Sequence, residues 1–135
     1  MFSGIKKLIK EYRELKYLAY HDSLTSLLNR NWLYKNMNNI SCEYVYFIDI
    51  NNLHEINKKG HTFGDEHIKM CVDSIKSRLC IYDKLVRYAG DEFILFSNDL
   101  YVIHTNKLYT VGMSRNSGNL HDAINKADSD MLKNK

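Results

Sequence analysis

Two acidic residues interrupt the most strand-like stretch of the chain. The presence of charges in an otherwise apolar stretch limits the possible folds more than any other feature. The stretch reads LVRYAGDEFILF (residues 85–96), with an apolar run on each side of Ala89 and Gly90. The pattern predicts a β-hairpin with a tight turn at these two residues, so that Asp91 and Glu92 begin the returning strand. A charge taken out of water without a partner costs several kcal/mol. The two carboxylates must therefore be hydrated, paired or bound to a cation.

A second strand-like stretch supplies a neighbour for this hairpin. Residues 44–50 read YVYFIDI, an apolar run with Asp49 near its end. If the two strands lie side by side, Asp49 and Asp91 converge on one site lined by oxygen atoms. Mg²⁺ takes such a site when a nucleotide supplies the remaining ligands. The sequence therefore predicts a divalent-cation site between these strands.

Five segments carry a resemblance that extends from residue 21 to residue 135. They are HDSLTSLLNR (21–30), FIDINNLHEINKKGHTFGDEHI (47–68), RYAGDEF (87–93), YTVGMS (109–114) and ADSDMLKNK (127–135). Their order and spacing are similar to those of the GGDEF diguanylate cyclase family. AGDEF alone is a weak signal, whereas five ordered segments make a specific one. The chain resembles a reduced, single-domain member of this family.

The resemblance implies an α/β fold of the α+β kind, the ferredoxin-like palm of nucleotide cyclases and polymerases. A central, mostly antiparallel sheet with helices packed on it is expected over residues 21–135. Further helices are expected over about 31–38, 50–57, 64–80 and 119–134, and further strands over 101–104 and 108–114. The helix that the family usually carries after the hairpin is absent. One face of the sheet should therefore be thinly covered, and a second subunit would bury it.

An amphipathic helix is expected ahead of this domain, over residues 1–20. Apolar side chains recur there every three or four positions, at Phe2, Ile5, Leu8, Ile9, Tyr12, Leu15 and Leu18. Such a helix covers the domain or pairs with its copy in a dimer. The alternative is contact with an anionic membrane surface, because the stretch carries five Lys and Arg residues against two Glu residues.

Composition excludes several other classes of protein. The 135 residues carry a net charge of +3, and the excess lies in the first twenty residues, so no stable nucleic-acid partner is expected. The three cysteines form no CxxC pair, and no apolar run approaches the roughly 18 residues of a membrane span. These features favour a cytoplasmic protein with reduced thiols.

The resemblance also implies an activity: condensation of two GTP molecules into cyclic di-GMP and pyrophosphate, with each subunit of a homodimer holding one GTP. Mg²⁺ or Mn²⁺ would be held by the carboxylates of Asp49 and Asp91 and the carbonyl of Ile50. Glu92 would be a further ligand or the group that accepts the hydroxyl proton. Ala89 and Gly90 would let the backbone approach the phosphates.

The substrate-binding residues implied by the resemblance depart from the family pattern. Asn57 and Asp65 would read the guanine edge, although the loop between them is one residue short; the two residues could instead cap helices. His54 stands where the family has a phosphate-contacting Lys, and its imidazole is shorter and mostly neutral at pH 7. Lys135 matches a second phosphate-contacting Lys, and the Arg usual four positions later is absent.

Two further motifs flank the hairpin. Asp22 belongs to the DxLTxLxNR signature, and the resemblance pairs it with Arg87. An RxxD product-inhibition site usually precedes the hairpin, but here Cys80 stands at the Arg position, with Asp83 at the Asp position. Loss of that bidentate donor makes product inhibition through this site unexpected.

Three functions stay open at this point. The first is an active diguanylate cyclase. The second is a synthase of another cyclic dinucleotide or oligonucleotide, for which the shortened base-reading loop leaves room. The third is a catalytically inactive GTP-binding or dimerisation module, which the changes at His54 and Ala89 favour.

Overall fold

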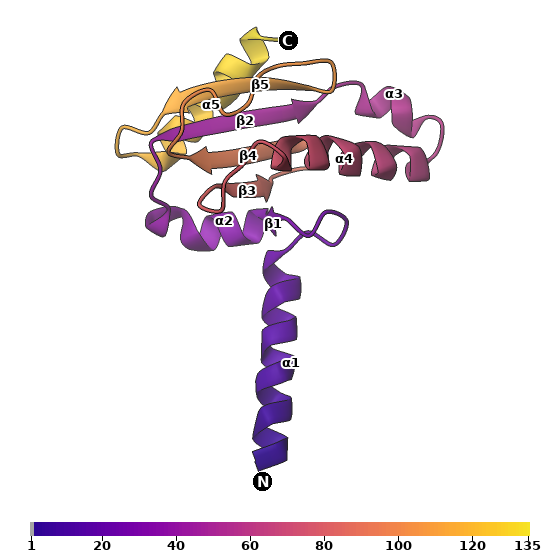
Figure 1. Ribbon diagram of the computed structural model, residues 1–135, viewed down its shortest axis with the longest axis vertical. Helices are drawn as coiled ribbons and strands as arrows, with labels where there is room; N and C mark the ends of the chain where they lie inside the picture. Colours follow the sequence, from indigo (N-terminus) through magenta and orange to yellow (C-terminus); the bar gives the residue numbers. More distant parts are fainter. Residues whose placement is uncertain (1) are drawn as a thin grey trace.

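A five-stranded sheet lies at the centre of the chain, of which the computed structural model describes residues 2–135 (Figure 1). Its strands are β1 (Leu28–Asn29), β2 (Tyr44–Ile50), β3 (Lys84–Arg87), β4 (Glu92–Ser97) and β5 (Tyr109–Arg115). They are ordered β1-β3-β4-β2-β5, with β1 parallel to β3 and every other pair antiparallel. The expected mostly antiparallel sheet is confirmed.

Five α-helices accompany the sheet in the described part of the chain. They are α1 (Phe2–Tyr20), α2 (Arg30–Asn36), α3 (Leu53–Asn57), α4 (His61–Lys76) and α5 (Leu120–Lys133), with a short 3₁₀ turn at Met37–Asn39. Asn29 and Asn119 cap α2 and α5, because the Oδ1 atom of each accepts a hydrogen bond of 3.0 Å from a backbone N–H three residues on. Helix α4 begins at His61, after the N-cap residue Gly60, and ends at Lys76, so the helix predicted over 64–80 was placed three to four residues too late in the chain.

Alternating residues of β2 divide the core into two clusters on opposite faces of the sheet. Tyr46 and Ile48 pack with α4, whereas Val45 and Phe47 pack with α5. Both faces are covered, which explains why this strand reads as a nearly continuous apolar run. The same alternation places Asp49 on the α5 face, at the end of the strand.

The segment between β4 and β5 forms a loop, and the strand predicted over 101–104 was wrong. Tyr46 donates a hydrogen bond of 2.6 Å from its hydroxyl to the carbonyl of Asp99, and the N–H of Val102 donates to the same hydroxyl. Tyr101 takes a left-handed backbone conformation, with φ of 57°. The loop therefore folds over Tyr46 and buries Ile103 instead of pairing with β5.

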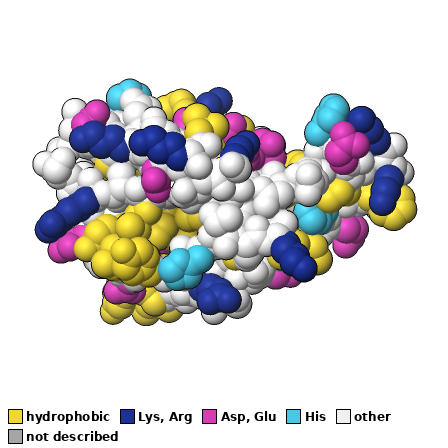
Figure 2. All heavy atoms as spheres, turned by 90° about the horizontal axis from the view of Figure 1, so that it is seen from above, with side chains coloured by type: hydrophobic (Ala, Val, Ile, Leu, Met, Phe, Trp, Pro, Cys, Tyr) yellow, Lys and Arg dark blue, Asp and Glu magenta, His cyan; other side chains and the backbone are white. Residues whose placement is uncertain are grey.

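A pocket of about 500 Å³ lies between this loop, β5 and the end of α5. Its lining includes Tyr101, His104, Val111 and Met113. The pocket lies beside the edge strand β5, whereas β2 and β4 are buried on both faces, so the expected thinly covered face is not observed. Figure 2 shows the molecule from above, where Lys and Arg side chains are interspersed with Asp and Glu side chains, and one large gathering of hydrophobic side chains is accompanied by smaller ones.

Helix α1 projects from the domain as a stalk (Figure 1). None of its residues is buried, and large apolar side chains such as Phe2, Leu8 and Leu18 are between 66% and 76% exposed. No helix in residues 2–135 has the length and apolar character needed to cross a bilayer. The apolar stripe of α1 therefore faces solvent in the single chain.

Gly112 sets how closely α5 approaches the sheet. A Cβ atom at this position in β5 would overlap the backbone of Ala127 and Met131 in α5. We expect Gly112→Ala to lower the free energy of unfolding by about 2 kcal/mol or more, because the helix must move away from its buried contacts. Urea unfolding followed by circular dichroism measures this change.

Gly4→Ala is the matched control, since a Cβ atom there meets nothing within 4 Å and α1 gains helix propensity. Equal stability of the two variants would contradict the close packing of α5 on β5.

Candidate functional site

Three side chains lie in a row across neighbouring strands at one end of the sheet. Asp49 in β2 is directly opposite Glu92 in β4. Tyr88, which follows β3, donates a backbone hydrogen bond of 2.8 Å to the carbonyl of Glu92. Residues paired in this way point to the same face of a sheet, here the face that packs against α2 and α5. The row therefore holds two carboxylates side by side.

The third predicted acid is held beside this row by the backbone. The N–H of Ile50 donates a hydrogen bond of 2.8 Å to the carbonyl of Asp91. This bond ties the turn of the hairpin to the end of β2. The Asp91 carboxylate lies close enough to Asp49 to raise the pKa of Asp49, and both residues line one pocket.

Asp49 is a buried charge whose partners do not fully satisfy it. The residue is 7% exposed, and its Oδ2 atom forms an ion pair with the ammonium of Lys135. Its Oδ1 atom is buried without a hydrogen-bond partner among the described residues. Burial raises the pKa of Asp49 and the Asp91 carboxylate raises it further, while Lys135 opposes both effects. Metal ligation is one way to satisfy such an atom.

The donors at this edge fit a hard divalent cation. The unpartnered Asp49 oxygen, the Asp91 carboxylate and the Ile50 carbonyl are all oxygen donors, which Mg²⁺ prefers. A cation beside them would also offset the mutual repulsion of the acids. The residues present therefore fit the predicted metal.

Glu92 belongs to the same acidic cluster. Burial raises its pKa, and the nearby carboxylates of Asp91, Asp49 and Asp128 raise it further, whereas Arg30 lowers it. Asp128 reaches this edge from α5. A glutamate held in this way gains a proton more easily than a free one.

Five of the predicted site residues line one open pocket of about 560 Å³. They are Asp49, Ile50, His54, Asp91 and Lys135. The pocket lies where β2 and the hairpin turn meet α3 and the end of α5. Glu92 lies beside it in the row but is not part of its lining.

Asn57 and Asp65 lie outside the lining of that pocket. Both are exposed, Asn57 at the end of α3 and Asp65 in α4. The side chain of Asn57 packs over Gly64, where an added Cβ atom would overlap its Oδ1 atom. Because Gly64 has no side chain, the side chain of Asn57 can lie over it, and Asp65 is the next residue of the chain. Their reading of a guanine stays a prediction.

The hairpin turn at Ala89 and Gly90 is held by Arg87. One guanidinium nitrogen donates a hydrogen bond of 2.9 Å to the Gly90 carbonyl, and another lies 3.0 Å from Asp22 Oδ2. The predicted pairing of Asp22 with Arg87 is thus present. A Cβ atom at Gly90 would meet nothing within 4 Å, so the turn borders open space.

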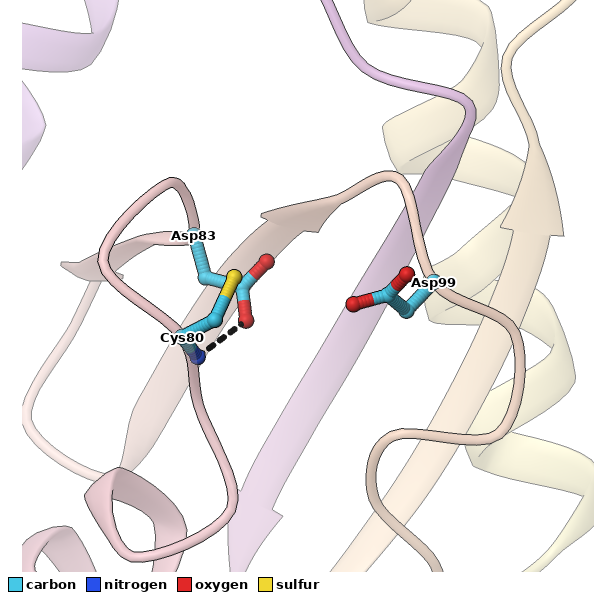
Figure 3. A group of neighbouring side chains, drawn as sticks. All are labelled: Cys80, Asp83 and Asp99. Atoms are coloured by element: carbon cyan, nitrogen blue, oxygen red, sulfur yellow. Dashed lines mark hydrogen bonds between the residues drawn. The ribbon is translucent and has the colours of Figure 1, made fainter.

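A different trio brings its possible ligand atoms within 4.8 Å of one another: Cys80, Asp83 and Asp99 (Figure 3). Cys80 and Asp99 are exposed. The carboxylate of Asp83 accepts a hydrogen bond of 2.9 Å from the backbone N–H of Cys80, which closes the turn. This trio is a surface turn without a buried ligand, and we assign it no metal.

Sequence reasoning missed three residues of the acidic edge. Asp128 lies in the ADSD segment, and Arg30 ends the DxLTxLxNR signature, so both stood within segments already singled out. Tyr88 stood in the RYAGDEF segment but suggested no role there. The hydrogen bond from Tyr88 N–H to the Glu92 carbonyl places Tyr88 beside Glu92, and the stacking of Arg30 on the Tyr88 ring brings Arg30 to the same edge.

Comparison with known proteins identifies relatives of this chain. The sequence matches the family described as "Diguanylate cyclase, GGDEF domain" over residues 19–106. Diguanylate cyclase DgcS of Shewanella oneidensis is 30% identical over 94 residues, 63% of this chain and 32% of DgcS. Cyclic di-GMP phosphodiesterase NbdA of Pseudomonas aeruginosa is 31% identical over 102 residues, 66% of this chain and 12% of NbdA. The chain spans less than a third of the length of the curated relatives it matches.

Solved structures show the same fold. The coiled coil and GGDEF domain of DgcB from Caulobacter crescentus, in complex with c-di-GMP, matches 97% of this chain and 88% of its own chain. The TM-score is 0.81 at 15% sequence identity. At this identity the likeness concerns the fold alone, and it includes the long N-terminal helix.

The pair of Asp22 and Arg87 generates a prediction about pH. Burial alone would raise the pKa of Asp22, but hydrogen bonds from Thr25 and Arg87 outweigh it and the pKa is lowered. Such a group stabilises the fold above its unfolded pKa of about 3.9, and this stability is lost as the pH falls through the lower folded value. We expect Asp22→Asn to cost roughly 2 kcal/mol at pH 7 and progressively less below pH about 4.

Urea unfolding of both proteins between pH 3 and pH 7 measures the difference. A difference that stays constant or grows towards acid pH would show that Asp22 is not held as a paired carboxylate.

Proposed function

Because the chain belongs to the GGDEF family of diguanylate cyclase domains, we propose that it condenses two GTP molecules into cyclic di-GMP and releases pyrophosphate. The observation that carries the proposal is the buried Asp49 carboxylate, which has one unpartnered oxygen beside Asp91 and Lys135. This edge combines oxygen donors for a cation with an ammonium for phosphate. A nucleotide triphosphate with a divalent cation satisfies both.

The metal would be held by the carboxylates of Asp49 and Asp91 and by the carbonyl of Ile50. Mg²⁺ is the expected ion, and Mn²⁺ has the same preference for oxygen ligands. When bound, the ion would spread the negative charge of the phosphates and make the attacking hydroxyl more acidic.

Glu92 would accept the proton of that hydroxyl. The 3′-hydroxyl oxygen of one GTP forms a bond to the α-phosphorus of the other, and the bond from this phosphorus to pyrophosphate breaks. The raised pKa of Glu92, due first to burial and then to neighbouring acids, brings it closer to the working pH of a general base. Further ligation of the metal is its alternative role.

Lys135 would exchange partners when the nucleotide binds. Its ammonium pairs with Asp49 in the free chain, and it lies at the pocket that the triphosphate would enter. His54 lines the same pocket and would contact phosphate more weakly than a lysine. Lys58 forms an ion pair of 3.1 Å with Glu55, so Lys59 is the better substitute.

The guanine would lie near the start of α4, where Asn57 packs over Gly64 and Asp65 follows. A carboxylate accepts hydrogen bonds from two guanine N–H groups, and an amide can satisfy the other edge of the base.

A second copy of the chain would bring the second GTP. The exposed apolar stripe of α1 supports parallel pairing of two stalks, because exposed apolar surface of this extent favours association. The relative DgcB was solved with its coiled coil. Contact of residues 1–20 with a membrane surface is the less favoured alternative, and no stable nucleic-acid partner is proposed. Three free cysteines support a reducing, cytoplasmic setting.

The proposal predicts a metal-dependent product. We expect purified protein incubated with GTP and Mg²⁺ or Mn²⁺ to form cyclic di-GMP, identified by mass spectrometry, and none when the metal is chelated. Asp91→Ala should lower the rate at least about 100-fold, since it removes a charged ligand of the ion that stabilises the transition state.

Asp73→Ala is the matched control, because Asp73 is an exposed acid of α4 outside the site. A mixed or adenine-containing product from GTP and ATP would replace the proposal with another cyclic nucleotide synthase. Nucleotide binding without any product would show an inactive binding module, and full activity of Asp91→Ala would contradict the assigned metal site.

The turn at Cys80 predicts weak feedback by the product. Cyclic di-GMP added at tens of micromolar should leave the initial rate nearly unchanged, because no arginine stands at Cys80 to bind its phosphates. Cys80→Arg should make the rate sensitive to the product, while Cys80→Lys should do so less because it lacks the planar fork. Equal strong inhibition of the wild type and of both variants would place any regulatory binding elsewhere.

A further inference from the structure

Arg30 is held on an aromatic support at the edge of the acidic cluster. It is the first residue of α2, and its guanidinium carbon lies 4.0 Å from the ring centroid of Tyr88 and 5.9 Å from that of Tyr34. The hydroxyls of Tyr34 and Tyr88 are 3.2 Å apart. The ring of Tyr88 also packs edge-on against Phe47 in the core. The guanidinium thus rests on a surface that is itself anchored.

Most donors of this guanidinium are free to bind a ligand. Arg30 is exposed and forms no ion pair with any of residues 2–135, and its polar interactions are with the tyrosine hydroxyls, chiefly that of Tyr88. An arginine has five N–H donors in a planar fork that matches a phosphate. Stacking on Tyr88 restricts the side chain, which lowers the entropy lost when an anion binds.

Arg30 and Lys135 lie at opposite ends of the row that contains the two acids. Tyr88, Glu92 and Asp49 occupy neighbouring strands in that order, so Arg30 lies at one end of the row. Lys135 lies at the other end, paired with Asp49. Two cations therefore bracket two acids. Since Lys135 is on the Asp49 side, where the chain's own nucleotide would lie, Arg30 is on the Glu92 side.

We propose that Arg30 is a phosphate-binding residue for the second nucleotide, the one whose hydroxyl Glu92 faces and which the partner copy carries. This inference rests on the proposed function, because it assumes that two nucleotides meet at this edge. It adds a cation that the family resemblance did not supply. Arg30 would hold the incoming triphosphate in register with Glu92, while Lys135 contacts the chain's own nucleotide.

A structural role alone would give a different pattern of effects. If Arg30 only covered the ring of Tyr88, its removal would change stability and leave nucleotide binding intact. Arg30→Met separates the two roles, because it keeps an unbranched apolar side chain over the ring and removes the charge. Arg30→Lys keeps the positive charge and loses the planar pair of N–H donors of the guanidinium. Arg115→Met, at the opposite end of the sheet, is the matched control.

The test uses three readouts on the full chain. The first is the dissociation constant of α,β-methylene GTP with Mg²⁺ for dilute protein, which reports the chain's own nucleotide. The second is self-association driven by the same analogue, measured by analytical ultracentrifugation. The third is the initial rate as a function of GTP concentration. Thermal unfolding of each variant confirms that it is folded.

We expect Arg30→Met to raise the half-saturating GTP concentration about tenfold and to weaken analogue-driven association by a similar factor. Arg30→Lys should fall between Arg30→Met and the wild type. The dissociation constant for dilute protein should change less than about twofold, and Arg115→Met should match the wild type in every readout.

Several results would overturn the inference. If Arg30→Met behaves like Arg115→Met, Arg30 binds no phosphate. If Arg30→Met raises the dissociation constant of the analogue for dilute protein by the same factor as the half-saturating GTP concentration, Arg30 binds the chain's own nucleotide. If the analogue drives no association of the wild type, no second nucleotide meets this edge. If the wild type forms no product, the proposed function fails, and the association readout still decides the role of Arg30.

Discussion

A charged carboxylate at the buried end of a central strand is the constraint on which the rest of this structure depends. Asp49 is 7% exposed, and only one of its oxygens has a partner in the described chain, the ammonium of Lys135. An apolar residue would fit this position at lower cost in stability. The neighbouring acids raise that cost, because like charges close together disfavour ionisation. Such an arrangement persists when it serves a ligand, and the ligand that we propose here is a divalent cation with a nucleotide.

The surrounding fold keeps these acids in place from three directions. The pairing of β2 with β4 sets Asp49 opposite Glu92, and a backbone hydrogen bond from Ile50 holds the turn that carries Asp91. Arg87 holds the other side of the turn through Gly90 and Asp22. The close approach of α5 at Gly112 positions the end of that helix, and with it Lys135, at the same edge. Cations thus flank the acids at the edge where we propose that a polyanionic substrate binds.

Local patterns were enough to predict the elements that carry the acids. The YVYFIDI run and the hairpin around Ala89 and Gly90 were predicted from apolar, strand-favouring runs and turn residues alone, because both signals lie within a dozen residues. The strand predicted over 101–104 failed because its competitor is distant in sequence: the hydroxyl of Tyr46 binds the loop backbone. Arg30 was missed for a similar reason. Its proposed role depends on the ring of Tyr88, and no local pattern reports a contact between residues so far apart.

The account depends on a cation shared by Asp49 and Asp91, and Mn²⁺ binding in the presence of a non-reacting GTP analogue tests it most directly. Electron paramagnetic resonance would give the Mn²⁺ affinity of the wild type, Asp49→Asn, Asp91→Asn and the double variant. A shared ion predicts that each single change weakens binding at least about tenfold and that the double change costs less than the sum of the two. Unchanged Mn²⁺ affinity in either single variant, or strictly additive losses, would contradict it.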